Sequence, residues 1–301
     1  MEEPMFSVIV PATTANLGPG YDSIGLALAL YMTVEVHRSA QWSVRFDGEE
    51  YADLPIDETN LIIQTTKTVA NRYGKELEPY ALYVKSEIPL GKGLGSSATA
   101  IAAGIEIANE LLTLSLSPRE KVRIGSEIEG HSDNVAAALL GGVTITYFID
   151  GEMEIVQLPE PKIGCVLLVP PNALKTSDSR GLLPKDLSHQ TASAGNAASN
   201  VMVAAVTLGD WKLAAKMMEK DVFHEPHRKP LLQDFDRIRE FCHGLGAYGM
   251  TISGAGPSLF IAVENGTEEN VARRLEKEFP YYRGIAVTPA HTGSNIKKDA
   301  H

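Results

Sequence analysis

The hydrophobic and polar positions of this chain repeat with two different periods, which predict strands in some segments and helices in others. Runs in which apolar and polar residues alternate, or in which β-branched residues are dense, indicate strands. In one such run Val34 and Val36 face one way while Thr33, Glu35 and His37 face the other, which is typical of a half-buried antiparallel strand. The predicted strands span Phe6 to Val10, Leu26 to His37, Trp42 to Phe46, Tyr80 to Lys85, Val143 to Ile149, Cys165 to Val169, Met250 to Ile252, Leu259 to Val263 and Ile285 to Thr288.

Other segments place apolar residues three and four positions apart and therefore predict amphipathic helices. The clearest lies near residues 101–112, and a second, over 118–129, follows a serine, a proline and a glutamate in capping-box spacing. Two more helices are predicted over 190–218, with a break at 209–210, and over 268–279. Strands that alternate with helices indicate a mixed chain of α and β structure.

The chain is long enough for two domains of ordinary size. Between residues 150 and 162 it becomes polar and contains proline, so this segment is the predicted linker. We therefore expect domains over 1–155 and 156–301, and residues 292–301 are expected to form a frayed tail.

The charge balance excludes some classes of partner. The 301 residues include 27 Lys and Arg against 38 Asp and Glu, which gives a formal net charge of −11. A surface with this balance repels the phosphates of nucleic acids and of anionic lipids, so no nucleic acid and no membrane is expected as a partner. Apolar residues make up 44% of the chain, which excludes a disordered protein.

Cysteine usage and the first residues of the chain bear on where the protein resides. Cys165 and Cys242 are the two cysteines and lie far apart, so neither a disulfide framework nor a cysteine zinc site is expected. The N-terminus is acidic where a signal peptide needs basic residues, and no apolar run approaches the ~18 residues of a membrane span. These features predict a cytoplasmic protein.

A glycine- and serine-rich turn leads directly into the most apolar predicted helix. It reads Pro89-Leu90-Gly91-Lys92-Gly93-Leu94-Gly95-Ser96-Ser97-Ala98-Thr99. The glycines let backbone N–H groups turn inward, the serines add hydroxyl donors, and the helix points its positive end at the turn. This arrangement favours a phosphate site, although it matches neither a Walker A loop nor Gly-x-Gly-x-x-Gly. From these residues alone, a flexible turn with a serine cap is the alternative.

Two further turns have the same small-residue character. Residues 11–22 pack small side chains around Asn16 and Asp22, whose carboxylate could hold a substrate ammonium or hydroxyl, or serve only in turn hydrogen bonds. The turn Ser253-Gly254-Ala255-Gly256-Pro257-Ser258 lies between two short apolar strands and could bring backbone close to a ligand or to the first glycine loop. An ordinary hairpin turn is the alternative for this segment.

Taken together, these segments resemble the homoserine kinases, a family of the GHMP small-molecule kinase superfamily. The resemblance rests on the three turns in their order along the chain and on Glu129-Gly130-His131-Ser132-Asp133-Asn134, and it extends from Val8 to about Val287. It implies an α+β fold with two domains, an N-terminal domain like domain 2 of ribosomal protein S5 and a C-terminal ferredoxin-like domain. It also implies ATP as co-substrate, Mg²⁺, phosphorylation of the side-chain hydroxyl of L-homoserine in threonine biosynthesis, and a possible homodimer.

The resemblance assigns residues to the amino acid substrate. Arg180 and Arg228 stand where the family places arginines for the substrate carboxylate, a role that suits the planar guanidinium. Asn16 and Asp22 should contact the amino and hydroxyl end of the substrate. Two more residues complete this set, Asn134 near the reacting oxygen and Thr176 close by. Read without the resemblance, the arginines would be surface residues and Asn134 a helix cap.

The resemblance also assigns the nucleotide and metal sites. Residues 91–99 should wrap the phosphates, and Asn60 and Lys85 match nucleotide-side positions. Lys92 could add charge at the loop or remain solvated. Ser97 and Glu129 are the expected Mg²⁺ ligands, because this cation prefers a hydroxyl and one carboxylate and keeps several waters. Glu127 is the alternative carboxylate.

The expected mechanism uses no strong general base. Several superfamily members carry an aspartate where this chain has Asn134, and an amide cannot accept a proton. Positioning and charge stabilisation then do most of the work. His131, His224 and His227 are interpreted as structural. Two alternatives remain, a related kinase of another alcohol such as mevalonate or a sugar, and a non-catalytic nucleotide or metabolite sensor on the same fold.

Overall fold

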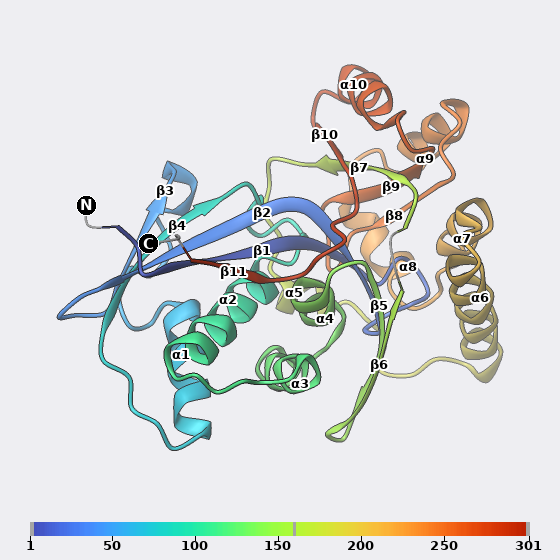
Figure 1. Ribbon diagram of the computed structural model, residues 1–301. Helices are drawn as coiled ribbons and strands as arrows, with labels where there is room; N and C mark the ends of the chain where they lie inside the picture. Colours follow the sequence, from blue (N-terminus) through green and yellow to red (C-terminus); the bar gives the residue numbers. More distant parts are fainter. Residues whose placement is uncertain (1–2, 159–160, 299–301) are drawn as a thin grey trace.

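The computed structural model describes residues 3–158 and 161–298, which form two β-sheets with helices packed against them (Figure 1). The strands are β1 (Phe6–Ala15), β2 (Ile24–Arg38), β3 (Ser43–Asp47), β4 (Tyr80–Ser86), β5 (Val143–Ile149), β6 (Glu152–Leu158), β7 (Gly164–Val169), β8 (Gly249–Ile252), β9 (Leu259–Val263), β10 (Arg283–Val287) and β11 (Asn295–Lys297). The helices are α1 (Leu61–Arg72), α2 (Ser96–Leu111), α3 (Pro118–Glu129), α4 (Asp133–Leu140), α5 (Thr176–Arg180), α6 (His189–Thr207), α7 (Trp211–Met218), α8 (Glu225–Arg228), α9 (Phe235–Gly244) and α10 (Glu268–Glu278).

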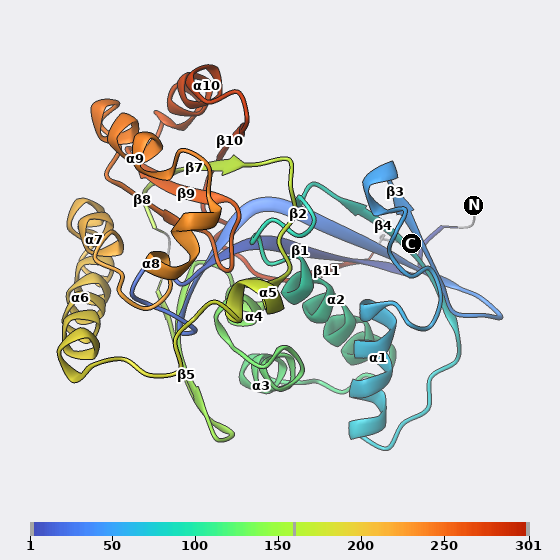
Figure 2. The ribbon, with the colours of Figure 1, turned by 180° about the vertical axis from the view of Figure 1, so that it is seen from behind.

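The larger sheet has the order β11-β1-β2-β4-β3, and β5 and β6 extend it from the far end of β2. Strand β2 pairs antiparallel with β1 and β4, as its alternating pattern predicted, and Val34 and Val36 are fully buried. Helices α1 to α4 lie on one face of this sheet (Figures 1 and 2). Helix α2 occupies the middle of that layer because its side chains are apolar over most of its circumference.

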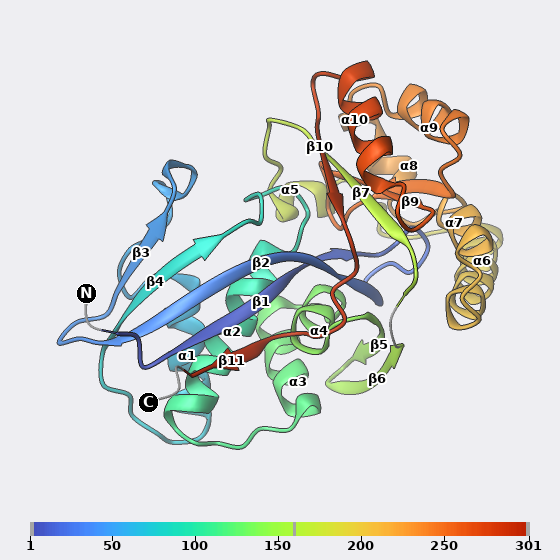
Figure 3. The same cartoon turned by 45° about the horizontal axis from the view of Figure 1, so that its top comes forward.

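The smaller sheet has the order β10-β7-β9-β8, with every pairing antiparallel. Its strands and helices follow one another as β-α-β-β-α-β, counting α5 to α9 as one helical segment, so the ferredoxin-like expectation is confirmed. Helices α9 and α10 pack on one face, against Val166 and Leu168 of β7 (Figure 3). Cys165 and Leu167, which point the other way, join the core that contains β1 and β2. The two sheets therefore share apolar contacts, and the chain is of the α+β class.

Two predictions about polar segments need correction. Residues 152–158 of the predicted linker form β6, which pairs with β5 along its whole length, while residues 159–160 lie outside the described ones. The tail is also ordered in part, since β11 pairs with β1, while residues 299–301 lie outside the described ones. Both strands are largely solvent-exposed, and Met153 is the one buried residue in them, which is why the pattern did not reveal them. The division at 155 falls inside β6 and stays a prediction.

The predicted helices are confirmed, including the break at 209–210 between α6 and α7. Ser117 accepts a hydrogen bond from the N–H of Glu120, and the glutamate side chain accepts one in return, so the capping box at the start of α3 is present. Within the described ranges, no helix is long and apolar enough to cross a membrane.

Candidate active site

The three small-residue turns predicted from the sequence meet at the junction of the two sheets. The N–H of Thr13 donates to the carbonyl of Leu94 at 3.1 Å, and the N–H of Gly254 donates to that of Ala15 at 3.1 Å. Ser253 donates through its hydroxyl to the carbonyl of Gly93 at 2.7 Å. The third turn thus brings its backbone against the first glycine loop, as the sequence suggested.

The glycine loop has the backbone shape of an anion cradle. Gly91, Gly93 and Gly95 all have left-handed backbone angles, with φ of 67°, 74° and 73°. Gly95 caps α2 without a side-chain hydrogen bond to the first-turn N–H groups, so these donors face the cleft together with Ser96 and Ser97. Such an unsatisfied helix N-terminus attracts negative charge.

The other loop residues support this cradle from behind. Ala98 is buried in the core, Leu94 is 1% exposed, and Thr99 donates to the carbonyl of Gly95 at 2.7 Å. Lys92 turns away from the cleft and donates to the carbonyl of Pro171 at 2.5 Å. Pro89 lies outside the lining of the cleft, at the start of the loop.

An apolar cavity of about 300 Å³ adjoins the cleft, and Ser96 and Ser97 line both. Its walls come from α1, α2, β2, β4 and the segment around Tyr51. Asn60 lies in this wall, where it caps α1 and donates to the carbonyl of Pro55 at 2.8 Å. Leu90 and Thr99 also line the cavity, whereas Lys85 does not. The ammonium of Lys85 lies 3.4 Å from Glu35 on the outer face of the sheet.

One of the two candidate metal carboxylates faces the cradle and the other does not. Ser97 donates to the carboxylate of Glu129 at 2.8 Å, and Glu129 lines the cleft. Burial raises the pKa of Glu129, and no cation pairs with it among the described residues. Glu127 instead pairs with Arg72, outside the cleft lining.

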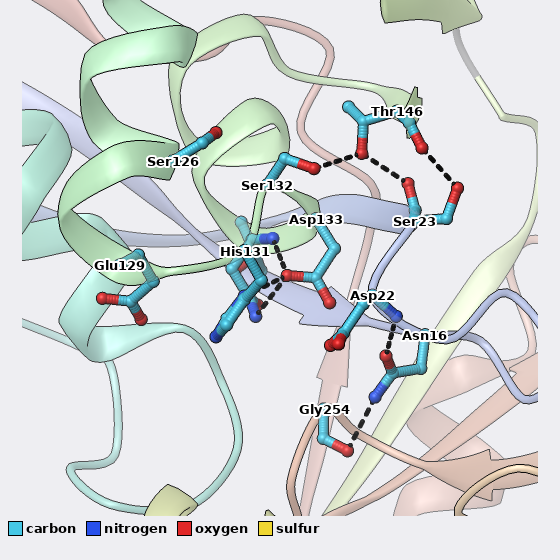
Figure 4. Close-up of polar contacts among 12 residues, drawn as sticks. Asn16, Asp22, Ser23, Ser126, Glu129, His131, Ser132, Asp133, Thr146 and Gly254 are labelled. Carbon is cyan, nitrogen blue, oxygen red and sulfur yellow. Dashed lines mark hydrogen bonds and ion pairs between the residues drawn. The ribbon is translucent and has the colours of Figure 1, made fainter. Parts of the chain in front are cut away.

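The turn over residues 11–22 presents the carboxylate of Asp22 to the cleft. Its backbone is strained and is held in place by hydrogen bonds. Asn16 and Asp22 both have positive φ, of 71° and 53°, which asparagine and aspartate tolerate better than most residues. The Asn16 amide accepts from the N–H of Asp22 at 3.0 Å and donates to the carbonyl of Gly254 at 3.0 Å (Figure 4). Asn16 thus makes a hydrogen bond within its own turn, which was the alternative interpretation from the sequence. It also connects this turn to the turn over residues 253–258.

The two predicted arginines both line the cleft, but Arg180 is exposed to solvent and Arg228 is buried. Arg180, at the end of α5, donates to both carboxylate oxygens of Asp22, at 2.8 and 2.9 Å. Thr176 begins the same helix and also lines the cleft. Arg228, at the end of α8, is 3% exposed and donates to the carbonyl of Gly254 at 3.1 Å. Both guanidinium carbons lie 5.7 Å from the centre of the Tyr21 ring.

Arg228 is a buried cation without a counter-ion. No carboxylate pairs with it within residues 3–158 and 161–298, and its Nε has no hydrogen-bond partner there. Burial lowers the pKa of its guanidinium. A buried charge is costly unless it is paired, so this residue is suited to receive an anion from a ligand.

Sequence reasoning missed one acidic residue of the same cleft, Asp133. Asp133 is 2% exposed, and its carboxylate accepts from Nδ1 of His131 at 2.7 Å. Ligand atoms of Asp22, His131 and Asp133 all lie within 4.8 Å of one another (Figure 4). Burial opposes the charging of His131, but its hydrogen bond to Asp133 and the charge of that group outweigh burial and raise its pKa. Both residues belong to the recognised segment 129–134, in which His131 had been interpreted as structural and Asp133 had been given no role.

Asn134 lines the cleft beside Gly95 of the glycine loop and is not the cap of α4. The helix begins at Asp133, with Ser132 in the capping position, so the cap interpretation was wrong. The amide oxygen of Asn134 accepts from Thr13 at 2.7 Å. The Ser132 hydroxyl is within 2.6 Å of the Thr146 hydroxyl, which donates to the carbonyl of Ser23.

Comparisons with known proteins place this chain in a family. The models "GHMP kinases N terminal domain" and "GHMP kinases C terminal" match residues 60–142 and 202–280. A homoserine kinase of Bacillus velezensis is 42% identical over 297 residues, which cover 99% of this chain and 96% of the relative. One of Bacillus cereus is 41% identical and covers 98% of each.

Solved structures agree with this result. The crystal structure of a homoserine kinase from Cytophaga hutchinsonii has a TM-score of 0.86 at 26% identity, over 98% of both chains. A mevalonate kinase structure with a TM-score of 0.70 is 16% identical over 95% of this chain and 99% of its own, and so shows the fold alone. The chain belongs to the homoserine kinase family of the GHMP kinases.

Proposed function

We propose that this protein transfers the γ-phosphoryl group of ATP to the side-chain hydroxyl of L-homoserine, forming O-phospho-L-homoserine and ADP. The observation that carries the proposal is Arg228, a buried guanidinium without a counter-ion among the described residues, in a cleft that also holds the carboxylates of Asp22 and Asp133. An amino acid brings one carboxylate and one ammonium to such a site. A sugar brings neither, and mevalonate brings no ammonium.

The amino acid end of the substrate is bound by groups of opposite charge on two sides of the cleft. Arg228 and Arg180 receive the carboxylate, because a guanidinium can donate two parallel hydrogen bonds to it. Asp22 and Asp133 face these arginines and accept from the ammonium. Asn16 holds the Asp22 turn in place through its two hydrogen bonds, and Thr176 lines the cleft beside Arg180.

ATP occupies the two adjoining cavities. The adenosine fits the apolar cavity beside Asn60, which has the low polarity and the size of a small-molecule site. The phosphates then lie over residues 91–97, where the loop N–H groups and the start of α2 neutralise part of their charge. Lys85, on the outer face of the sheet, is not part of this proposed site.

The donors beside the cradle fit Mg²⁺. Ser97 offers a hydroxyl and Glu129 a carboxylate that no protein cation neutralises within the described residues, and hard oxygen donors of this kind suit this ion. Glu127 is already paired with Arg72, so Glu129 is the carboxylate we propose. A bound Mg²⁺ neutralises charge on the phosphate oxygens.

Positioning carries the transfer in this proposal. The Asn134 amide lies between Thr13 and Asp133, which fix its orientation, and it cannot remove a proton. The hydroxyl oxygen therefore bonds directly to the γ-phosphorus as the bond to the ADP oxygen breaks, and its proton passes to an oxygen of the transferred phosphoryl group, while the loop and α2 hold the phosphates in line. If Asp22→Asn kept its affinity for homoserine but lost several orders of magnitude in turnover with an altered pH profile, Asp22 would be the base instead.

The test is a substrate panel. Purified protein is incubated with ATP, Mg²⁺ and L-homoserine, mevalonate, galactose or shikimate, and ADP and the phosphate ester are measured. We expect ADP release that depends on homoserine alone. Absence of homoserine-dependent ADP would overturn the proposal, and phosphorylation of another alcohol would support the related-kinase alternative.

The assignment of the metal carboxylate is tested by comparing two variants, one at each candidate glutamate. Glu129→Gln should raise the Mg²⁺ concentration that gives half-maximal rate at least tenfold, whereas Glu127→Gln should leave it near the wild-type value. Equal Mg²⁺ requirements in both variants would contradict the assignment.

A further inference from the structure

Two residues with opposite roles in the proposed site are bound to each other in this structure. Arg180 and Asp22 are separated by 158 positions and form a bidentate ion pair across the cleft, with both N···O distances below 3.0 Å. Their side chains are 42% and 32% exposed, so the pair lies at the mouth of the cleft. The pair occupies two N–H groups of Arg180 and one lone pair on each oxygen of Asp22, so a ligand that takes these positions must displace the partner.

The local charges favour the ion pair between Asp22 and Arg180. The carboxylate of Asp22 lies beside that of Asp133, and two neighbouring carboxylates repel each other unless a cation intervenes. Arg180 supplies a cation to Asp22, while Asp133 accepts from Nδ1 of His131. Arg228 has no such partner, because burial and the carbonyl of Gly254 fix it deeper in the cleft.

Resting on the function proposed above, we propose that the Asp22–Arg180 pair determines specificity by making recognition of the carboxylate and of the ammonium interdependent. A zwitterion breaks the Asp22–Arg180 ion pair and replaces it with two others, because its carboxylate pairs with Arg180 and its ammonium pairs with Asp22. A ligand with only one of these charges breaks the ion pair but can bind only one of the two residues, so the other residue loses its partner. The pair therefore disfavours each singly charged analogue and leaves the amino acid as the ligand that compensates for both.

The test compares ligands that lack one charge. L-Homoserine, 4-hydroxybutyrate, which lacks the ammonium, and 3-aminopropan-1-ol, which lacks the carboxylate, are titrated by calorimetry into wild-type protein, Asp22→Asn and Arg180→Lys. Asparagine tolerates the left-handed backbone at position 22, and lysine keeps the charge at position 180 while losing the bidentate geometry.

The expected results differ from those of a variant that only loses a contact to its ligand, because each variant should bind one analogue more tightly. Asp22→Asn should bind 4-hydroxybutyrate about two- to fivefold more tightly than wild type, the range for a partly exposed ion pair, although it binds homoserine more weakly. Arg180→Lys should bind 3-aminopropan-1-ol about two- to fivefold more tightly, although the charge at position 180 is unchanged. A general electrostatic effect would not produce the second gain.

The control is a pair with the same geometry at a distance from the cleft. Arg119 bonds to both carboxylate oxygens of Glu154, at 3.1 and 3.0 Å, and Arg119→Lys should leave all three affinities unchanged. If wild type phosphorylates homoserine but neither analogue gains affinity in its variant, the specificity proposal is overturned while the function stands. If wild type releases no homoserine-dependent ADP, the function itself fails.

Discussion

We expect Arg228→Met to stabilise the ligand-free protein while it removes most of the affinity for homoserine. Arg228 is 3% exposed and pairs with no carboxylate in the described part of the chain. An unpaired buried ion costs several kcal/mol, and methionine keeps a long side chain that can adapt to the space. The carbonyl of Gly254 loses one donor but keeps the amide of Asn16 at 3.0 Å. The free energy of unfolding should therefore rise by about 1 kcal/mol.

The loss of function follows from the same burial. A carboxylate that meets a desolvated guanidinium gains about 2–4 kcal/mol relative to a site without one. This range corresponds to a KM for homoserine about 30- to 700-fold higher. The KM for ATP should stay within about twofold, because Arg228 lines the substrate cleft and not the apolar cavity.

Arg239 is the matched control, because it is a half-buried arginine with a partner. It donates to both oxygens of Glu225, at 2.8 and 2.6 Å. Arg239→Met leaves that carboxylate unpaired, and such a loss typically costs 3–5 kcal/mol. Urea denaturation gives the stabilities and steady-state kinetics the KM values. The reasoning is wrong if Arg228→Met destabilises the protein as much as Arg239→Met, or if it raises both KM values together.

Two further predictions concern the loops around the cleft. Gly95→Ala should destabilise the protein by about 2–4 kcal/mol, because a Cβ there would overlap Oγ1 of Thr13 in addition to the strain of a positive φ, whereas Gly130→Ala, with open space around it, should show only about 1–2 kcal/mol of strain in thermal melts. Equal losses would refute the overlap. Burial lowers the pKa of His224 despite the buried carboxylate of Asp221 at 3.2 Å, so the unfolded chain takes up the proton first, and stability should fall as the pH drops below about 6.5. His224→Gln should flatten this part of the pH profile in urea denaturation, and an unchanged profile would contradict the assignment.

The sequence by itself determined the features that depend on neighbouring residues. The capping box at Ser117, the period of α2 and the alternation of β2 follow from local geometry, and the structure has all three. The glycine loop was also identifiable, because only glycine adopts positive φ readily at 91, 93 and 95. Strands β6 and β11 escaped this reasoning since their residues are mostly exposed and are held by pairing with distant strands.

Tertiary structure alone decided how the charges of the cleft are arranged. The sequence could propose Arg180 and Arg228 as equivalent, but only the fold pairs the first with Asp22 and buries the second without a counter-ion. The same holds for Asp133, whose importance comes from its distance to Asp22. Interaction between charges depends on separation in space and on burial, and neither quantity is contained in the spacing of residues along the chain.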